Sequence, residues 1–417
     1  MMDLAKSAWD GSREDPVYLG LTDYGQGHPS ATRSFSQIVT VADLAGWVIN
    51  GLALAGIGYT IAATFLVGRY APSPVGPGQA VLPMTVLKPL HGTEPQLLAN
   101  LDTLLRQDYG APLQIIFGLR DGDDPAIAVV EALMARYPAA NIALVIDPAR
   151  RGSNNKVSNL INMASRIAHP LVVISDSDVA LPPGSLNRLA AATNDPEIGL
   201  ASCFHIGRGD AGWWSVLGAM DIAYRFMPSV AVACATGLGQ PALGPTMALR
   251  REVLEAIGGF ARFCDVLADD YEMGRAVRAL GLHTVVPPLA IIHCCAEETL
   301  GTLIRHELRW TRTIYGIDRA GFIGSGVTHC LPLALIGAAM TGGGWFALSA
   351  VGAALAARFT LAVRVDRAAG QSSGPKWLLP ARDIVSFYVY LTTFFGNRVE
   401  WRGARFKVAR DGRIAAD

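Results

Sequence analysis

Long stretches without charge lie near both ends of the chain and frame a region in which hydrophobic and polar positions alternate. Residues 44–68 contain no charged side chain, and a run of about 20 apolar residues is what a hydrocarbon core about 30 Å thick requires. We therefore predict a transmembrane helix over residues 44–68. It begins too far from the N-terminus for a cleaved signal peptide, and we expect residues 1–43 to form a flexible tail.

Two further apolar stretches follow in the C-terminal part. Residues 320–357 carry no charge, are too long for one span and are interrupted by the triple glycine 342–344. They predict a transmembrane helical hairpin within residues 320–363, with Arg358 reaching the membrane interface at its end. The run 384–396 holds about 13 apolar residues, fewer than the roughly 17 that a span needs, and predicts a re-entrant or interfacial helix.

A basic tail follows this last helix. Its positive residues are Arg398, Arg402, Arg405, Lys407, Arg410 and Arg413. Since cytoplasmic segments next to spans carry an excess of Lys and Arg, we expect residues 364–417 to end in a cytoplasmic tail. The segment 69–319 is then a single cytoplasmic domain, in which we expect the chemistry to lie.

In the first part of this domain, short apolar runs alternate with amphipathic stretches. The strands are predicted at 84–88, 113–119, 142–146 and 171–175, and the helices between them at 94–107, 126–136 and 157–168. Such a βαβ series predicts an α/β fold with a Rossmann-like, mainly parallel sheet, whose ligands bind at the carboxyl ends of the strands. The polar residues that follow each strand are therefore the candidates for a site.

A cluster of carboxylates follows the second predicted strand. An N-cap of the next helix accounts for Asp123 or Asp124. Asp121 lies nearer the strand and is the better candidate for a ligand contact.

Asp176 and Asp178 follow the fourth predicted strand and form a D-x-D pattern. Taken alone, this short pattern is common by chance, but its place at a strand end strengthens the functional interpretation. Carboxylates there suit a hard divalent ion, Mg²⁺ or Mn²⁺, held by few protein ligands while a diphosphate fills the other positions.

Lys156 ends a polar turn that leads into a predicted helix. A helix N-terminus with a lysine can face a phosphate or a ribose, although an ordinary solvated loop explains the turn equally well. Further on, Asp269 and Asp270 open another helix. Asp269 fits a helix cap. Asp270 is our candidate for a base that accepts a proton from an alcohol.

The segment His306 to Trp310 stands just ahead of the predicted hairpin. Arg309 can offset charge on a departing diphosphate, and Trp310 can form one wall of an acceptor pocket. An Arg-Trp pair beside a membrane is also typical of an interfacial anchor, and this alternative stays open.

Composition agrees with a domain joined to a membrane part. Hydrophobic residues make up 51% of the 417 residues and charged residues 17%, and the mean hydropathy is +0.30. The formal net charge of +0 gives no field that would attract a polyanion, so we expect no nucleic-acid partner. The six cysteines lack paired metal-ligand spacing and are expected to be reduced thiols.

The ordered motifs resemble the ceramide glucosyltransferase family (glycosyltransferase family 21), and also the bacterial hopanoid-type lipid glycosyltransferases. The resemblance runs from the segment Val86-Leu87-Lys88-Pro89-Leu90 through the hairpin, roughly three quarters of the chain. It rests on an early aspartate, a D-x-D-like second motif, a third aspartate in an acidic pair and a (Q/R)-x-x-R-W motif. It implies a GT-A fold for the cytoplasmic domain.

The resemblance also implies roles for the individual residues. Asp121 would contact the uridine, Asp176 and Asp178 would bind the metal and diphosphate, Lys156, Asp269 and His306 would face the donor, Asp270 would be the base, and Arg309 and Trp310 would complete the site. One departure is visible, because His306 stands where the motif has Gln or Arg.

The implied enzyme is an inverting transferase in a bacterial inner membrane, using a UDP-sugar donor and a lipid acceptor. UDP-glucose with ceramide is the leading expectation, and UDP-N-acetylglucosamine with a hopanoid polyol is the alternative. The apolar segment 211–235 is either an interfacial surface for the lipid or a buried helix. A polysaccharide synthase is the nearest rival enzyme, and a catalytically silent membrane scaffold is the rival of another class.

Overall fold

The computed structural model describes residues 41–70, 81–396, 398–401, 404–408 and 414–416. The predicted N-terminal tail falls almost wholly on residues 1–40, outside the described residues. Helix α1 (Val41–Val67) covers the predicted first span.

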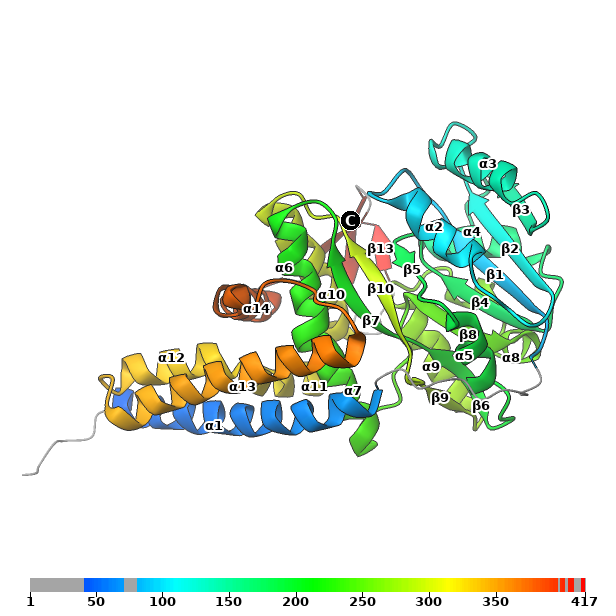
Figure 1. Ribbon diagram of the computed structural model, residues 1–417. Helices are drawn as coiled ribbons and strands as arrows, with labels where there is room; N and C mark the ends of the chain where they lie inside the picture. The colour runs from blue at the N-terminus through cyan, green and yellow to red at the C-terminus, as the bar shows by residue number, and fades with distance from the viewer. Residues whose placement is uncertain (1–40, 71–80, 397, 402–403, 409–413, 417) are drawn as a thin grey trace, which may run out of the picture. The chain divides into compact units, whose positions relative to one another are not determined.

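A mixed sheet forms the centre of the α/β part (Figure 1). In spatial order its strands are β3 (Asn141–Ile146), β2 (Leu113–Leu119), β1 (Met84–Pro89), β4 (Leu171–Ser175), β8 (Thr246–Arg250), β6 (Ile198–Ser202) and β9 (His283–Val285). The first four strands are parallel, and β8 runs antiparallel to β4 and β6. The four predicted strands and the mainly parallel α/β class are confirmed.

Helices cover both faces of this sheet because its strands are apolar on both sides. Val86 packs in one core with α2 (Leu97–Leu105), α3 (Ala126–Arg136) and α5 (Ser185–Ala192). Its neighbour Leu87 packs in another core with α4 (Asn155–Ala164), α8 (Arg251–Ala256) and α9 (Asp269–Ala279). Two predicted helices differ at their ends: α2 begins after Gln96, whose φ is +62°, and α4 begins after the capping residue Asn154.

A small second sheet continues the chain from the acidic motif. It consists of β5 (Val179–Ala180), β10 (Ala290–Cys295) and β7 (Phe204–Gly209). Strand β5 follows Asp178 directly and pairs with β10 through His293. The second sheet therefore brings residues more than a hundred positions apart to the end of β4.

The apolar segment 211–235 folds as one helical stretch with a π-helical turn in its middle. It comprises α6 (Trp213–Asp221), a π-helical turn (Ile222–Phe226) and α7 (Met227–Thr236). Of its most apolar window, 67% is buried inside the protein, which favours the buried-helix alternative over an interfacial surface.

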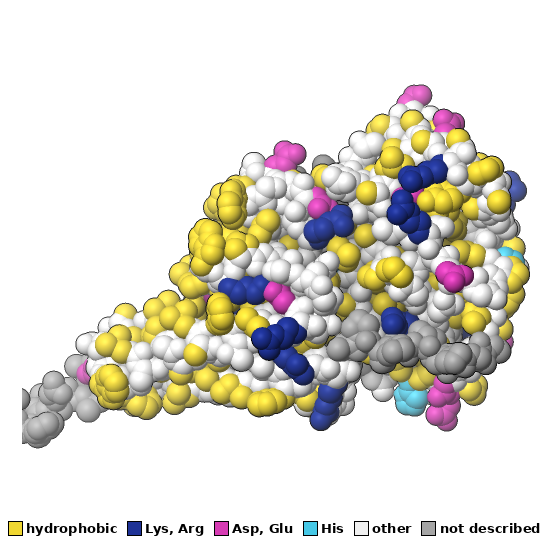
Figure 2. All heavy atoms as spheres, in the orientation of Figure 1, with side chains coloured by type: hydrophobic (Ala, Val, Ile, Leu, Met, Phe, Trp, Pro, Cys, Tyr) yellow, Lys and Arg dark blue, Asp and Glu magenta, His cyan; other side chains and the backbone are white. Residues whose placement is uncertain are grey.

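Three helices of the described residues are long and apolar enough to cross a membrane: Asp43–Val67, Trp213–Thr236 and Trp345–Ala369. The number of possible spans rises to four if the bent pair Arg319–Thr328 and Cys330–Met340 is taken as a single span. Helices α1, α12 (Cys330–Met340) and α13 (Trp345–Ala369) pack through small residues, with Ala53, Ala334 and Ala354 fully buried. In Figure 2 the face over α1 and α13 is mostly hydrophobic or uncharged.

The predicted hairpin has unequal arms. Its first arm is α11 (Arg319–Gly324), a 3₁₀ turn (Ser325–Thr328) and α12, with a bend of 68° before α12. Its turn lies at the predicted glycines, since Gly342 and Gly343 both have positive φ. The second arm, α13, continues past residue 363 to Ala369.

The prediction that Arg358 reaches the membrane interface is wrong. Arg358 is buried, and its guanidinium forms a bidentate pair with Asp383 at 2.7 and 2.8 Å. It also donates to the carbonyl of Tyr224 at 2.6 Å. A fixed fork of donors matches a carboxylate well, so the pair holds Arg358 inside the protein.

Helix α14 (Leu379–Thr393) replaces the predicted helix 384–396 and begins five residues earlier. At 15 residues it is about 22 Å long, shorter than a hydrocarbon core. Beyond it, β11 (Arg398–Trp401), β12 (Ala404–Val408) and β13 (Ile414–Ala416) form an antiparallel sheet. Part of the predicted basic tail is therefore structured, while Arg402, Arg410 and Arg413 lie outside the described residues.

Candidate active site

Lys88 is buried beneath the acidic motif. It lies on β1 with 0% of its surface exposed. Its ammonium donates to Ser175 Oγ at 3.1 Å, to the carbonyl of Val179 at 3.2 Å and to the carbonyl of Asp176. Burial lowers the pKa of Lys88 to about 8, against the raising effect of the nearby carboxylates of Asp178 and Asp176. Lys88 therefore ties the end of β4 to β5 and fixes the loop that carries both aspartates.

Lys156 lies between two carboxylates at the start of α4. Asn154 caps this helix by accepting from the backbone N–H groups of Lys156 and Val157. The Lys156 ammonium is 2.6 Å from Asp176 Oδ1 and 3.7 Å from Asp269 Oδ2. Burial alone would lower the pKa of Lys156, but these carboxylates outweigh it and hold the pKa above its usual range. The solvated-loop alternative for Lys156 is wrong.

The acidic pair of α9 faces the same lysine. Asp269 is the first residue of the helix and makes no cap; Ala268 occupies the N-cap position. The capping alternative for Asp269 is therefore wrong, because its buried carboxylate turns towards Lys156 instead. Asp270 is half-buried and packs against Gly244, where a Cβ would lie 2.8 Å from its Oδ2.

Asp270 has the proton affinity of a base that works near neutral pH. Burial first, and the neighbouring Asp269 second, raise the pKa of Asp270 to about 6. A carboxylate with a pKa near 6 is largely ionised at pH 7 and accepts a proton more readily than an ordinary surface aspartate. The raised pKa is compatible with the base predicted at Asp270, and that role stays a prediction.

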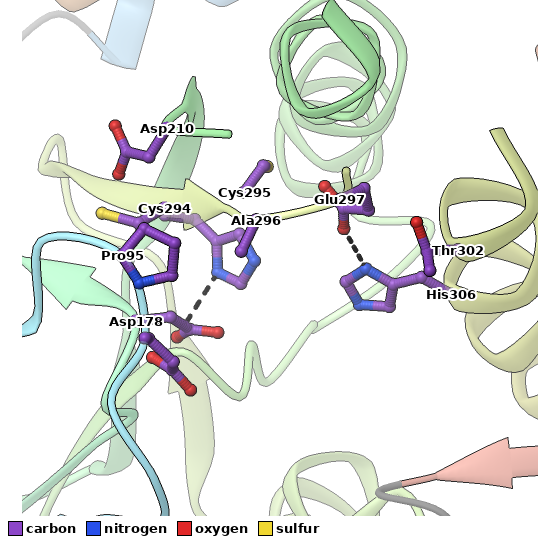
Figure 3. A pocket seen from close by; sticks show the side chains of 11 residues that line it. Pro95, Asp178, Asp210, Cys294, Cys295, Ala296, Glu297, Thr302 and His306 are labelled. Carbon is purple, nitrogen blue, oxygen red and sulfur yellow. Dashed lines mark hydrogen bonds and ion pairs between the residues drawn. The ribbon is translucent and has the colours of Figure 1, made fainter. Parts of the chain in front are cut away.

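Asp178 faces a pocket of about 290 Å³ (Figure 3). Its Oδ1 lies 3.8 Å from His293 Nδ1, and among the described residues neither atom has a hydrogen-bond partner. Burial would raise the pKa of Asp178, but His293 and Lys88 lower it below the usual value. Asp178 is thus an ionised carboxylate with a free ligand position beside an imidazole nitrogen.

A divalent ion held by Asp176 and Asp178 would need further ligands from a bound molecule. Within the described part of the chain, no three His, Cys, Asp or Glu side chains form a ready-made metal site. Asp176 and Asp178 supply carboxylate oxygens, and His293 Nδ1 is the nearest unsatisfied nitrogen. Mg²⁺ and Mn²⁺ at phosphate sites use few protein ligands and take the rest from phosphate and water, so the residues present fit such an ion.

The far wall of the pocket comes from α10 (Leu300–Ile317). A capping box of Thr299 and Thr302 starts this helix. In Figure 3 His306 points at Glu297, to which its Nδ1 is hydrogen-bonded. Burial lowers the pKa of His306, against the raising effect of Glu297.

Trp310 stands one turn beyond His306 on the same helix. Its ring centroid is 4.5 Å from that of His306 and 5.9 Å from that of His293. It also packs against the cluster of Ala219, Ile222 and Cys295, so its side chain is partly buried within the protein. Arg309, the residue before it, is half-buried on α10.

Asp121 is not brought into contact with the other predicted residues. It is exposed, and its Oδ1 accepts from the backbone N–H of Asp123 at 3.0 Å. Asp124 is buried and accepts from the N–H groups of Gly92 and Ala126, although the N-cap position of α3 is Pro125. A nucleotide contact by Asp121 remains a prediction.

Three residues of the site were not predicted from sequence. Lys88 belongs to the segment in which the family resemblance begins, but no role was predicted for it. A charged residue in the middle of an apolar strand was the signal that could have identified it as a site residue. His293 and Glu297 carried no recognisable motif, and only the pairing of β10 with β5 brings them to Asp178.

Together the α/β sheet, the acidic motif at the end of β4 and the lysine between two acidic pairs define the glycosyltransferase class that the motifs predicted. A sequence profile of Glycosyl transferase family 21 matches residues 48–414, and the chain belongs to this family. Family membership and the sheet topology together confirm the predicted fold class, a GT-A α/β domain with membrane-type helices.

Several characterised proteins are similar to this chain. Ceramide glucosyltransferase 1 of Caenorhabditis elegans is 21% identical over 368 residues, which cover 83% of this chain and 75% of the nematode protein. An N-acetylglucosaminyltransferase of Rhizobium leguminosarum bv. viciae is 25% identical over 292 residues, covering 64% of this chain and 66% of that protein. Among solved structures, the mannosyltransferase PcManGT from Pyrobaculum calidifontis, in complex with GDP-Man and Mn²⁺, is 20% identical with a TM-score of 0.45, covering 83% of this chain and 99% of that one.

Proposed function

We propose that this glycosyltransferase moves a sugar from a UDP-sugar onto the hydroxyl of a membrane lipid, with inversion at the anomeric carbon. The observation that carries the proposal is the position of Lys156 between Asp176 and the acidic pair Asp269 and Asp270. This cluster puts a cation held by two carboxylates near a base with a pKa near 6. A diphosphate leaving group and an alcohol nucleophile need these two groups.

In the proposed reaction, Asp270 accepts the proton of the acceptor hydroxyl while its oxygen attacks the anomeric carbon. The bond from that carbon to the diphosphate breaks, and UDP leaves with the electron pair. Lys156 and Arg309 offset the charge that develops on UDP. No covalent sugar intermediate forms, so one displacement inverts the configuration.

Asp176 and Asp178 would hold Mg²⁺ or Mn²⁺, with His293 beside them. When bound, such an ion neutralises charge on the diphosphate. Asp121 would contact the uridine, and Asp269 and His306 would border the donor. These assignments follow the family motifs and the proximity of all but Asp121 to the pocket or to Lys156.

UDP-glucose and ceramide are the substrates we propose first, since the nematode relative is a ceramide glucosyltransferase. A hopanoid polyol with UDP-N-acetylglucosamine is the second candidate, and the rhizobial N-acetylglucosaminyltransferase supports that donor. We further propose a multi-pass protein of a bacterial inner membrane with its α/β part in the cytoplasm. The apolar helices α1 and α13 support membrane attachment.

The test is a substrate panel with purified full-length protein. UDP-glucose or UDP-N-acetylglucosamine is incubated with vesicles that contain ceramide or a hopanoid polyol, and the lipid products are identified by mass spectrometry. We expect one glycolipid from wild type, about a hundredfold less or lower from Asp270→Asn, and wild-type amounts from the control Glu272→Gln, which alters a carboxylate that pairs with Arg275 on the same helix. A polymeric product would show a polysaccharide synthase, and an unchanged donor in every combination would contradict the proposal.

A further inference from the structure

Helix α10 presents two adjacent rows of side chains to different surroundings. His306 lines the pocket, and Trp310, one turn further on, packs against its ring at 4.5 Å between centroids. Glu307 and Thr311, also one turn apart, are buried against α14. Residues four apart lie on one face of a helix, so the position of the first row is set by what holds the second row.

Arg382 of α14 makes the central contact of that second row. It is 1% exposed, and its guanidinium donates to Glu307 Oε2 at 2.7 Å and lies 2.9 Å from Asp221 Oδ1 at the end of α6. Ser386, one turn along α14, donates to the same Asp221 at 2.6 Å. Arg225 completes the cluster by pairing with Asp221 through two nitrogens. Two carboxylates are thus balanced by two guanidinium groups in the interior.

A second contact lies at the far end of α14. Thr393 donates its hydroxyl to Thr311 at 2.7 Å, about 16 Å along the helix from Arg382. These two contacts are far apart on α14 and reach residues one turn apart on α10. Together they fix the rotation of α10 about its axis and its position along that axis. Neither Arg382 nor Thr393 lines the pocket.

The next residue of α14 offers a matched comparison. Asp383 is equally buried and charged, but its partner is Arg358 of α13 rather than a residue of α10. The opposite face of α14 is apolar and exposed at Ile384, Tyr388 and Leu391. The helix that carries Arg382 inward therefore presents a surface suited to lipid outward.

We propose that Arg382 is a positioning residue for sugar transfer: by bridging Asp221 and Glu307 it holds α10, and with it His306 at the pocket and Trp310 behind His306. The kinetic part of this inference rests on the proposed function. In Arg382 the Nη2 nitrogen contacts both carboxylates and Nε adds a contact to Asp221 at 3.3 Å. A lysine in its place keeps the charge but loses the Nε contact and the planar geometry, so α10 shifts although the charge balance is kept.

Arg382→Lys, Thr393→Val and Asp383→Asn are the variants that test this, each in the full-length protein in lipid. For each variant the measured quantities are kcat, the KM values for donor and lipid, and the hydrogen exchange of the backbone amides. A shift of about 1 Å in a positioning element can cost up to roughly a hundredfold in rate, so we expect Arg382→Lys to lose about tenfold to a hundredfold in kcat. Its donor KM should change less than its kcat, because Lys156 and Asp176 are untouched and only His306 among the proposed donor contacts moves with α10.

The controls separate positioning from general stability. Thr393→Val removes one hydroxyl contact without unpairing a charge and should lower kcat by about threefold, with Asp383→Asn near wild type. Exchange should quicken in α10 and stay unchanged in α9 for Arg382→Lys. Equal losses of kcat in Arg382→Lys and Asp383→Asn, or full kcat in Arg382→Lys, would overturn the inference. If Arg382→Lys does not fold, full kcat in Thr393→Val overturns it.

The two proposals fail in different ways. If wild type transfers no sugar, the proposed function is wrong, and the exchange of α10 in Arg382→Lys still decides whether Arg382 holds that helix. If wild type is active and α10 exchanges as in wild type in the variant, the proposed function stands and the role of Arg382 is wrong.

Discussion

Replacing Asp270 by asparagine is the sharpest perturbation of the proposed chemistry. The change keeps the shape of the side chain beside Gly244 and removes its ability to accept a proton. Asp270 does not share an ion pair with Lys156 of the kind that Asp176 and Asp269 have, so the donor contacts around Lys156 should persist. The loss should therefore appear in kcat rather than in donor binding.

The magnitude follows from the role and from the pKa. General-base catalysis contributes about 10²–10⁴-fold to a rate, so Asp270→Asn should lower kcat by that factor. In wild type the pKa of Asp270 is raised to about 6 by burial and by Asp269. The base must be unprotonated to act, so kcat/KM should be level above pH 7 and fall about tenfold per unit as pH drops below 6. An ordinary aspartate would place that fall near pH 4.

The assay is a pH series of initial rates for wild type, Asp270→Asn and the control Glu272→Gln, with donor binding measured at each pH by calorimetry. The reasoning predicts that the acid limb near pH 6 is present in wild type and in the control and absent from the residual rate of Asp270→Asn. An Asp270→Asn protein that keeps a third or more of the wild-type kcat, with the same acid limb, would refute the assignment of the base.

Substitutions at three further positions test other parts of the site. Lys156→Met removes the cation between Asp176 and Asp269. Because a charge-assisted contact contributes about 1.5–3 kcal/mol, calorimetry with Mn²⁺ should show UDP binding weakened by about tenfold to a hundredfold. Unchanged UDP binding would contradict the donor role of Lys156. Lys88→Met leaves three oxygen acceptors without the ammonium that donates to them. The free energy of unfolding should therefore fall by about 1–3 kcal/mol or more, and the melting temperature should fall with it. An unaltered melting temperature would show that Lys88 does not contribute to stability. His306→Gln should retain kcat within about threefold because an amide can still donate to Glu297, whereas His306→Ala should not; equal losses in both would mean that the imidazole itself is required.

Much of the α/β part could be predicted from local pattern. The four parallel strands are short apolar runs separated by amphipathic stretches, and each was found where its run lies. The D-x-D motif was located because it follows a predicted strand of a parallel sheet, where ligands bind. Asp269, at the start of α9, and Lys156, at the start of α4, come together with Asp176 although they are far apart in sequence.

The errors concern charges whose partners are distant. Arg358 follows an apolar stretch, so its sequence indicated a residue at the membrane interface, but Asp383 on another helix pairs with it in the interior. His293 reaches Asp178 only because β10 pairs with β5, and no local pattern predicts that pairing. The 68° bend before α12 was missed because only charge was considered, although Gly324 and Gly326 precede the bend and Pro332 lies in the first turn of α12.

The central claim is inverting transfer of sugar to a lipid, and the anomeric configuration of the product tests it most directly. Wild-type protein is incubated with an α-linked UDP-sugar and the lipid acceptor that reacts, and the purified glycolipid is examined by proton NMR. The account predicts a β-linked sugar on the lipid hydroxyl. An α-linked glycolipid, or free sugar as the sole product with every lipid offered, would contradict it.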